Sequence, residues 1–317
     1  MTFSDKDKYR SLCEDESIPL FMQAWWMDAV CVRGYWDVFL YEKNGKIIAA
    51  MPFHVRKKLG FKFIIEPQLT QYSGIWIKHP ENITFQKKYT LEKEVYFYFI
   101  EQLNQYGFTY YQQTFPPSFT NWQPFYWKGF KQTTRYTFII DSLTDTSTVY
   151  EKFSQRKKRD IKKAESRLTV SYDLTADEFY QFHRHSLLQK GERINYSREL
   201  IARISTATNA RNQGMIMGAY DNEQHLQASL LVIWDKQCAY CLAYALDNQY
   251  KNSGASTLLF WRAIQQLSTE TTIFDFEGSM IESVADSYLQ FSSASLPFYS
   301  ISKSNALVAC LIKYSGH

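Results

Sequence analysis

The dipeptide Asn44–Gly45 is the feature that most constrains how the first half of this chain can fold. It lies between two apolar runs, residues 37–43 and 46–53. Asn-Gly in that setting is the strongest short-range signal for a β-hairpin, because both central residues of the tight turn need a positive φ. The first half therefore contains antiparallel strands, and a regular alternation of parallel strands and helices is excluded.

A second segment of the chain has the same layout as this hairpin. Tyr41 to Ala49 and Tyr220 to Ala228 each contain a strand end, an acidic tight turn and a strand start that ends in alanine, with equal spacing. Internal self-similarity of this kind is short, but it gains weight if both halves have the same fold. We then expect Asn44–Gly45 and Asn222–Glu223 to occupy equivalent hairpins of a duplicated structure.

Strand-like and helix-like segments alternate irregularly along the rest of the chain, which indicates an α+β fold that is not doubly wound. In the first half we expect helices over 21–30 and 84–106, and strands over 61–77, 108–113 and 133–140. In the second half we expect helices over 149–167, 176–189, 197–208, 253–267 and 283–291, and strands over 168–172, 214–220, 226–234, 239–246, 272–276 and 298–303.

The length of 317 residues favours two domains. The small polar stretch 141–148 is the expected boundary, which gives domains over 1–145 and 146–317. An aromatic fraction of 17% with only 12 glycines and 8 prolines excludes disordered and collagen-like classes. A net charge of +4 is too small to predict nucleic-acid binding.

Targeting features are also missing from the sequence. The first residues lack the apolar core of a secretory signal, and no apolar run reaches the roughly 20 residues of a membrane span. Five cysteines at irregular spacing indicate reduced thiols and a cytoplasmic protein. Cys238 and Cys241 form a CxxC pattern on a strand, where positions three apart face opposite sides, so we expect buried structural cysteines and no metal site.

The most informative block is the loop of small residues that opens the helix over 253–267. It consists of Lys251, Asn252, Ser253, Gly254, Ala255 and Ser256. Such a loop leaves the N–H groups of the first helical turn accessible, and the helix dipole adds partial positive charge, so an anion such as a pyrophosphate can bind. The alternative is an ordinary helix cap. We expect Gly254 to lie at the closest approach to the anion, where a side chain would block it.

The next block supplies candidates for proton transfer. Asp275 and Glu277 alternate with aromatic residues on a short strand, so both carboxylates should face one side and could act as a general base. Tyr288 on the following helix could donate a proton to a leaving group. The alternative for the acids is that one caps the helix and the other is solvated.

The segment from Tyr150 to Leu168 has eight basic and three acidic residues, which makes it the most basic helix of the chain. Its basic stripe contains Arg156 and Arg159, opposite an apolar stripe that contains Ile161. One interpretation is a solvated face opposite a buried one. The other is that Arg156 and Arg159 bind phosphate of a nucleotide-linked substrate, of CoA or of tRNA.

Several of these blocks together resemble the GNAT acyltransferase fold, and more closely the tandem-GNAT proteins related to the Fem-type peptidoglycan aminoacyltransferases. The resemblance is carried by residues 250–259, 274–279, 287–291 and 297–301, and by the basic helix. It covers residues 149–303, and the first half only through its hairpin and element order. The usual acyl-CoA motif is a basic residue or glutamine, two further positions, and then Gly-x-Gly or Gly-x-Ala. The loop departs from this motif because it has one glycine, Gly254.

The resemblance implies two GNAT-like domains in tandem, each a mixed, mostly antiparallel sheet flanked by helices. It further implies transfer of an acyl group, most simply acetyl, from acyl-CoA as co-substrate to an amine on a small molecule or cell-wall precursor, with no tightly bound cofactor. In that fold, a splayed strand pair leaves backbone amides for the thioester carbonyl. Two alternatives stay open: an aminoacyl-tRNA-dependent transferase acting on a cell-wall precursor, and a catalytically silent protein that binds a nucleotide-linked ligand or RNA.

Overall fold

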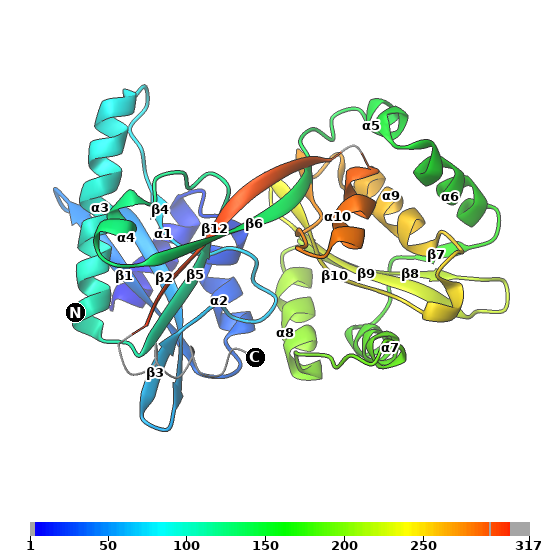
Figure 1. Cartoon of the computed structure of the whole chain (residues 1–317), viewed down its shortest axis with the longest axis horizontal. Coiled ribbons are helices and arrows are strands. Elements are labelled where there is room, and N and C mark those ends of the chain that lie inside the picture. The colour runs from blue at the N-terminus through cyan, green and yellow to red at the C-terminus, as the bar shows by residue number, and fades with distance from the viewer. Residues whose placement is uncertain (1–3, 292, 305–317) are drawn as a thin grey trace. The chain divides into compact units, whose positions relative to one another are not determined.

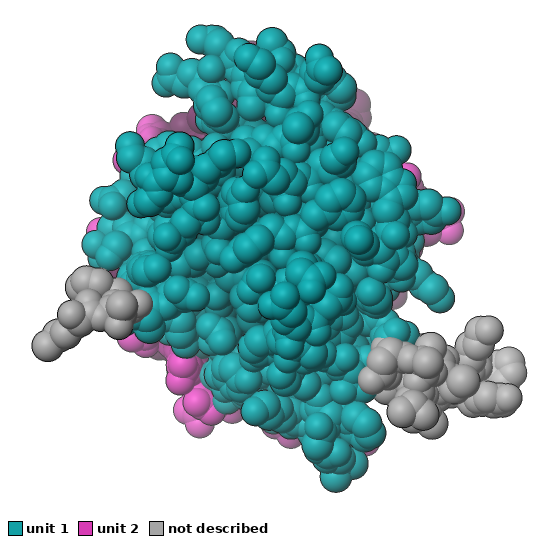
Figure 2. Space-filling model, turned by 90° about the vertical axis from the view of Figure 1, so that its left-hand side faces the viewer, with its two compact units in different colours: residues 1–135, 297–317 teal, residues 136–296 magenta. Residues whose placement is uncertain are grey.

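The computed structural model describes residues 4–291 and 293–304, and these residues form two compact units. The first unit takes in the described part of residues 1–135 and 297–317, and the second consists of residues 136–296 (Figure 1; Figure 2). The main chain therefore passes from the first unit to the second after Arg135 and returns at Pro297. No helix in the described part of the chain is both long and apolar enough to cross a bilayer.

The first unit is a sheet with helices packed on it. Its helices and strands, in chain order, are α1 (Asp5–Asp15), η1 (Leu20–Met22), α2 (Ala24–Val30), β1 (Tyr35–Lys43), β2 (Lys46–Lys58), β3 (Phe61–Ile64), β4 (Trp76–Ile77), α3 (Phe85–Tyr106), β5 (Tyr110–Phe115) and α4 (Gln123–Trp127). The long helix α3 buries Val95, Phe99 and Leu103, which recur at helical spacing and meet the apolar face of β2 and β5.

The last strand of the first unit's sheet comes from the far end of the chain. The strand order is β1-β2-β3-β5-β12, where β12 covers Ala294–Ser304 and its residues from Tyr299 onward pair antiparallel with β5. The pair β3 and β5 is parallel. Ile301 of β12 is fully buried among the aromatic residues of this core, so the first unit is complete only with this returning segment.

The second unit has the same general plan. Its elements are β6 (Lys131–Ile140, with its C-terminal half in this unit), α5 (Thr146–Lys152), α6 (Gln155–Glu165), β7 (Thr169–Ser171), α7 (Ala176–Gln189), α8 (Arg198–Asn209), β8 (Gly214–Tyr220), β9 (Leu226–Trp234), β10 (Cys238–Leu246), η2 (Asn248–Tyr250), α9 (Ala255–Leu267), β11 (Ile273–Asp275) and α10 (Glu282–Leu289).

The second unit's sheet has the strand order β6-β11-β10-β9-β8-β7. Helices α6, α9 and α10 cover one face, and α7 and α8 cover the other (Figure 1). Helix α9 is the centre of the core, since Leu258, Ala263, Ile264 and Leu267 are all buried against the sheet. A chain segment with apolar residues on nearly every side becomes a buried helix, as here.

The two hairpins anticipated from the sequence occupy equivalent places in the two units. Asn44–Gly45 joins β1 to β2, and residues 221–225 join β8 to β9. Both pairs of strands have a register shift next to the turn. In each unit a three-stranded meander is followed by a helix and then by a strand parallel to the third. This confirms the predicted duplication of an α+β fold with mixed, mostly antiparallel sheets.

The domain limits differ from the predicted 1–145 and 146–317. The compact units divide at residues 135/136, and the last strand belongs to the first unit rather than to the second. The physical reason is strand exchange. Ile139 and Ile140 of β6 pair with β11 of the second unit, while the end of β12 pairs with β5 of the first. A boundary that is placed at a polar linker does not reveal such an exchange.

Most predicted helices and strands are present, and the main differences concern three segments. The single helix expected over 149–167 is two helices, because Ser154 caps a new helix through a hydrogen bond from the N–H of Lys157. The strand expected over 61–77 is two short strands joined by a loop. Helix α1 was not predicted, although Ser4 and Asp7 form a capping box at its start. Cys310 lies outside the described residues, and the four other cysteines are free thiols.

Candidate active site

Two parallel strands diverge in the middle of the second unit. β10 and β11 are paired only from Cys238 to Tyr240, opposite Ile273 to Asp275. β11 then ends, whereas β10 continues to Leu246 with a partner, β9, on its other side. In the described part of the chain, the edge of β10 from Cys241 onward has no strand next to it on the β11 side.

A pocket of about 610 Å³ lies in the second unit beside this open edge. Its wall is formed by the end of β10, the start of α9, the start of α6 and one face of α10. The lining residues of greatest chemical interest are Arg156, Lys157, Asp160, Tyr244, Lys251, Asn252, Gly254, Ala255, Ser256, Thr257, Asp286, Ser287 and Tyr288.

The start of α9 presents backbone donors to this pocket. The N–H of Ala255 is bonded to Ser253 Oγ at 3.2 Å, and the N–H of Leu258 is bonded to the carbonyl of Gly254 at 2.9 Å. Between them, the N–H groups of Ser256 and Thr257 have no hydrogen-bond acceptor among the described residues. The hydroxyl of Ser256 is buried without a hydrogen-bond partner in this part of the chain. These groups are suited to an anion.

Gly254 has a role that the sequence did not indicate. It adopts φ 84°, in the left-handed region. A β-carbon at this position would lie 2.5 Å from the carbonyl oxygen of Asp160, so it would collide with the backbone of α6. The close packing of α6 and α9 therefore requires glycine at this position. The expectation that an anion comes closest to the backbone at Gly254 stays a prediction, and Gly254 does line the pocket.

The basic helix contributes Arg156 and Lys157 to the pocket, but not Arg159. The side chain of Arg159 is bonded to the carbonyl of Gln155 at 3.3 Å, outside the pocket lining. Lys157 is 7% exposed, and its Nζ donates to Ser287 Oγ at 2.9 Å and lies 4.3 Å from the centre of the Phe291 ring. Burial lowers the pKa of Lys157 to about 8.

Lys157 is the clearest site residue that the sequence analysis missed. It lies at helical spacing before Ile161 and Ala164, so a lysine occupies a position on the buried stripe of α6. A charged residue on an otherwise apolar stripe is the sequence signal that could have identified Lys157. In the described part of the chain no carboxylate forms an ion pair with Lys157, although Asp160 lies near enough to favour its charged form.

Asp275 and Glu277 do not share the face of a continuous strand, because β11 ends at Asp275. The carboxylate of Asp275 is 3% exposed and accepts hydrogen bonds from Thr137 Oγ1 and from the N–H of Glu277 at 2.7 Å. Glu277 adopts φ 60°, which an ordinary strand residue does not. Asp275 thus holds the turn that sets the direction of Glu277.

The carboxyl of Glu277 is the unusual acid of this region. Its Oε1 is buried without a hydrogen-bond partner among the described residues. Burial, followed by the charge of Asp275, raises the pKa of Glu277 well above its usual range. Burial raises the pKa values of Cys241 and Tyr288, and the charge of Glu277 raises both further. A raised pKa in a buried acid is typical of functional sites.

Tyr288 lies where the sequence analysis expected a phenol, on the helix after the acidic turn. Its ring stacks on Phe276 with centroids 4.9 Å apart, and its hydroxyl interacts with that of Tyr244 on β10. Burial raises its pKa well above the usual range. The Tyr244 hydroxyl was not singled out from the sequence, because 23 tyrosines offered no means of choosing it.

The structure thus brings most of the predicted site residues to one place. Arg156, Lys251, Asn252, Gly254, Ala255, Ser256 and Tyr288 all line the pocket. Ser253 accepts a hydrogen bond from the N–H of Ala255 and lines a second pocket of about 400 Å³. Asp275, Glu277 and Arg159 are outside the pocket lining, although Glu277 lies close to Tyr288.

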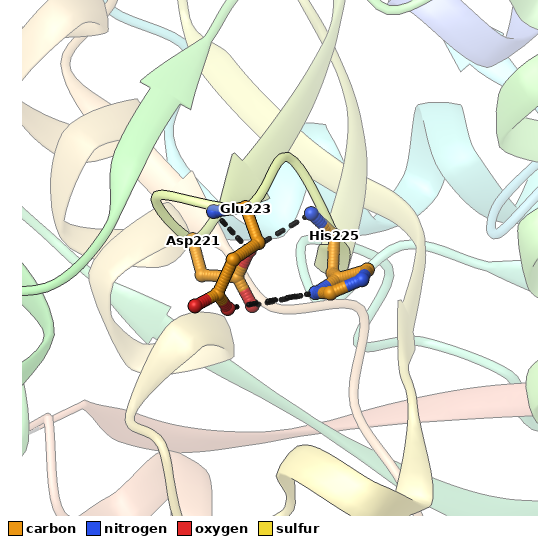
Figure 3. A group of neighbouring side chains, drawn as sticks. All are labelled: Asp221, Glu223 and His225. Atoms are coloured by element: carbon orange, nitrogen blue, oxygen red, sulfur yellow. Dashed lines mark hydrogen bonds and ion pairs between the residues drawn. The ribbon is translucent and has the colours of Figure 1, made fainter.

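One group in the described residues could share a cation: Asp221, Glu223 and His225 (Figure 3). The carboxylate of Asp221 accepts hydrogen bonds from the N–H of Glu223 at 3.1 Å and of His225 at 2.9 Å. These bonds account for the group as part of the β8–β9 turn, and we assign no metal to it.

A sequence profile described as "Acetyltransferase (GNAT) domain" matches residues 151–279, which include the start of α6, the open edge of β10, the α9 loop and Glu277. The chain carries a GNAT acetyltransferase domain. This GNAT domain, an acyltransferase domain, lies within the second unit. No curated protein matches the chain in sequence.

Solved structures extend the likeness of the GNAT domain to the whole chain. FemX aligns with a TM-score of 0.66 at 10% identity, covering 94% of this chain and 96% of that one. L-PGS from Bacillus licheniformis aligns with a TM-score of 0.58 at 12% identity, and the alignment covers 97% of this chain and 95% of that one. A tandem GNAT protein from the clavulanic acid biosynthesis pathway aligns with a TM-score of 0.53 at 11% identity, and the alignment covers 94% of this chain and 92% of that one. At these identities the alignments show a common tandem fold.

Proposed function

We propose that the second unit transfers an acyl group, in the simplest case acetyl, from acyl-CoA to an amine. The observation that carries this proposal is that one pocket joins the donor-rich start of α9 to the open edge of β10. The first can hold the phosphates of the donor, and the second can hold its thioester. The match to a GNAT domain over the same residues supports this assignment.

The phosphate end of the donor would lie at the start of α9. The free amides of Ser256 and Thr257 and the cations Arg156, Lys157 and Lys251 face this part of the pocket. Asp160 and Asp286 also line it, so positive charge exceeds negative charge there. A buried cation such as Lys157 without an ion-pair partner is costly unless a ligand supplies the opposite charge.

The thioester end would lie along β10. The N–H of Asp247 donates to the carbonyl of Gln227 of β9 at 3.0 Å. Backbone N–H groups alternate sides along a strand, so the N–H groups of Tyr244 and Leu246 point away from β9. The Leu246 carbonyl, on that same side, accepts from Ser186 Oγ at 2.7 Å. An amide on the open edge can donate to a carbonyl oxygen as negative charge develops on it.

Two side chains would move the protons. The amine must lose a proton to attack the carbonyl carbon, and Glu277, as carboxylate, would accept it directly or through a water. The nitrogen–carbon bond then forms, the carbon–sulfur bond breaks, and CoA leaves as a thiolate. Tyr288, whose hydroxyl is held by Tyr244, would donate a proton to that sulfur. Asp275 would act by holding the Glu277 turn.

A second donor deserves a test because α6 has further cations on its outer side. Arg159, Lys158 and Lys162 lie outside the pocket lining and are available to a larger anionic ligand, such as the tRNA of an aminoacyl-tRNA donor. An aminoacyl ester would use the same open edge and the same proton-transfer groups.

The deciding experiment supplies the full chain with acetyl-CoA and a panel of small amines and amino-sugar peptides. We expect release of free CoA thiol and a product whose mass is that of the amine plus one acetyl group, both lost in a Glu277→Gln, Tyr288→Phe double variant. Product formation only with aminoacyl-tRNA would establish the second donor. If ligands raise the melting temperature but neither donor yields product, the protein binds without catalysis.

A further inference from the structure

The β2–β3 hairpin of the first unit has an unusual tip, residues 56–62, which we call the hairpin tip. Leu59 is 87% exposed there, and Phe61 is 45% exposed. Arg56, Lys57, Lys58 and Lys62 flank these two residues, and the hairpin tip contains no acidic residue. In Figure 1 this hairpin projects from the first unit at its lower end, away from α3 and α4.

The turn at this tip is stereochemically costly. Leu59 and Gly60 have φ 51° and 79°, and they form a two-residue turn between Lys58 and Phe61. The β1–β2 turn has the same geometry but uses Asn44 and Gly45, with φ 52° and 72°. Asparagine adopts the left-handed region readily, whereas leucine rarely does, because its β-carbon then crowds the following carbonyl oxygen. The hairpin tip therefore exposes a large apolar side chain where the turn itself favours asparagine.

The cations around Leu59 are largely unused within the protein. Arg56, Lys57 and Lys58 are exposed, and none of them is in an ion pair with another described residue. Lys57 lies 5.7 Å from the centre of the Tyr35 ring, which leaves its ammonium group at the surface. Only Lys62 is tied down, by a hydrogen bond of 2.7 Å to the carbonyl of Tyr106.

We propose that the hairpin tip binds the surface of an anionic phospholipid bilayer. Leu59 and Phe61 insert at the level of the headgroups, and Arg56, Lys57 and Lys58 contact the lipid phosphates. An apolar tip with basic residues around it matches the two contributions to interfacial binding, which are burial of apolar area and attraction to anionic lipid. This proposal concerns the first unit and is independent of the acyl transfer proposed for the second.

The chemistry of the tip favours a bilayer over a single-stranded nucleic acid. Nucleic-acid surfaces rely on planar side chains that stack on bases. The most exposed apolar residue here is the aliphatic Leu59, which has no face for stacking but gains free energy from the interfacial region of a membrane.

Vesicle co-sedimentation of the full chain tests this proposal, with vesicles of phosphatidylcholine alone or with about one quarter phosphatidylglycerol. We expect binding to the anionic vesicles only, weakened by salt. Leu59→Asn introduces the residue that the other hairpin uses, so it should leave the melting temperature equal or higher while reducing binding roughly tenfold. Lys57→Glu with Lys58→Glu should reduce binding by roughly 25-fold or more, about fivefold for each lost cation.

The matched control is Lys46→Glu with Lys87→Glu, the same change of charge at two exposed positions elsewhere in the first unit. This variant should bind vesicles within about threefold of wild type, less than the effect of one basic residue at the surface. The proposal is overturned if wild type does not bind anionic vesicles, if Leu59→Asn binds as wild type does, or if the control loses as much as the tip variant. Tip-dependent binding to single-stranded RNA without vesicle binding would also overturn it.

Discussion

Lys157 donates a hydrogen bond of 2.9 Å to the hydroxyl of Ser287, and this bond connects α6 to α10 at the wall of the pocket. The lysine is 7% exposed and its pKa is lowered to about 8 by burial. A side chain that would be more stable neutral is thus kept in the wall of a pocket that otherwise suits an anion. We interpret this as stability given up for ligand binding.

The first prediction is that Lys157→Met stabilises the protein at pH 7 and weakens its binding of acetyl-CoA. The folded-state pKa is below the usual lysine value, so the unfolded chain binds the proton more tightly, and the charge costs about 1.4 kcal/mol per pKa unit. Wild type should gain stability as the pH rises from about 8 to 10.5, whereas Lys157→Met should not. Urea unfolding at several pH values measures both. Parallel pH curves for the two proteins would contradict the prediction.

The second prediction is that binding of acetyl-CoA near pH 9 takes up protons. An anion beside Lys157 favours the charged lysine and raises its pKa from about 8, so a neutral lysine becomes protonated on binding. Calorimetry in buffers of different ionisation enthalpy measures this uptake. Lys157→Met is the control, and an uptake of the same size in this variant would show that another group is responsible.

The third prediction is that Gly254→Ala destabilises the fold by about 2 kcal/mol or more, since it combines a left-handed φ with a collision against the Asp160 carbonyl. Ser253→Ala is the comparison, because it removes only the hydrogen bond from the Ala255 N–H to the Ser253 hydroxyl, which is worth about 1 kcal/mol. Chemical denaturation of both variants provides the measurement. A Gly254→Ala protein as stable as wild type would mean that α6 and α9 are less closely packed than the structure has them.

The fourth prediction is that Glu277→Gln lowers kcat by about 10²-fold or more and leaves the affinity for acetyl-CoA unchanged. Because burial raises the pKa of Glu277, the carboxylate forms only as the pH rises, and activity should increase with pH through that raised pKa. Wild type should also lose stability relative to the variant as the pH rises from the usual glutamate pKa through this raised pKa, because ionising the buried carboxyl is costly. Asp275→Asn keeps an acceptor for the Glu277 amide and should retain more activity. Equal losses in both variants would argue against a distinct function for Glu277.

The general fold could be predicted because local signals agreed with it. Asn44–Gly45 specified a hairpin, and the small residues before Leu258 specified a helix start. The strand exchange could not be predicted, because nothing in the sequence of an apolar strand such as 298–303 indicates which sheet it joins. A domain boundary read from a polar linker is therefore displaced by any exchanged strand.

The candidate site was less accessible to sequence reasoning than the fold. In the run from Arg156 to Arg159, the choice of the inward-facing cation depends on the phase of α6, which begins at the cap of Ser154. Without that helix start, Arg159 was chosen and Lys157 was missed. Glu277 was expected to continue a strand, but a positive φ at this residue has no signature in the side chain of a glutamate.

The most direct test of the central claim, that the pocket of the second unit is the acyl-donor site, is calorimetric titration of acetyl-CoA into wild type, Arg156→Glu and Arg159→Glu. The two variants change the charge equally, three residues apart on α6, but only Arg156 lines the pocket. We predict that Arg156→Glu weakens binding by about tenfold or more, as expected for loss of a charge-assisted phosphate contact, and that Arg159→Glu stays within about threefold of wild type. No binding to wild type, or equal losses in the two variants, would contradict the claim.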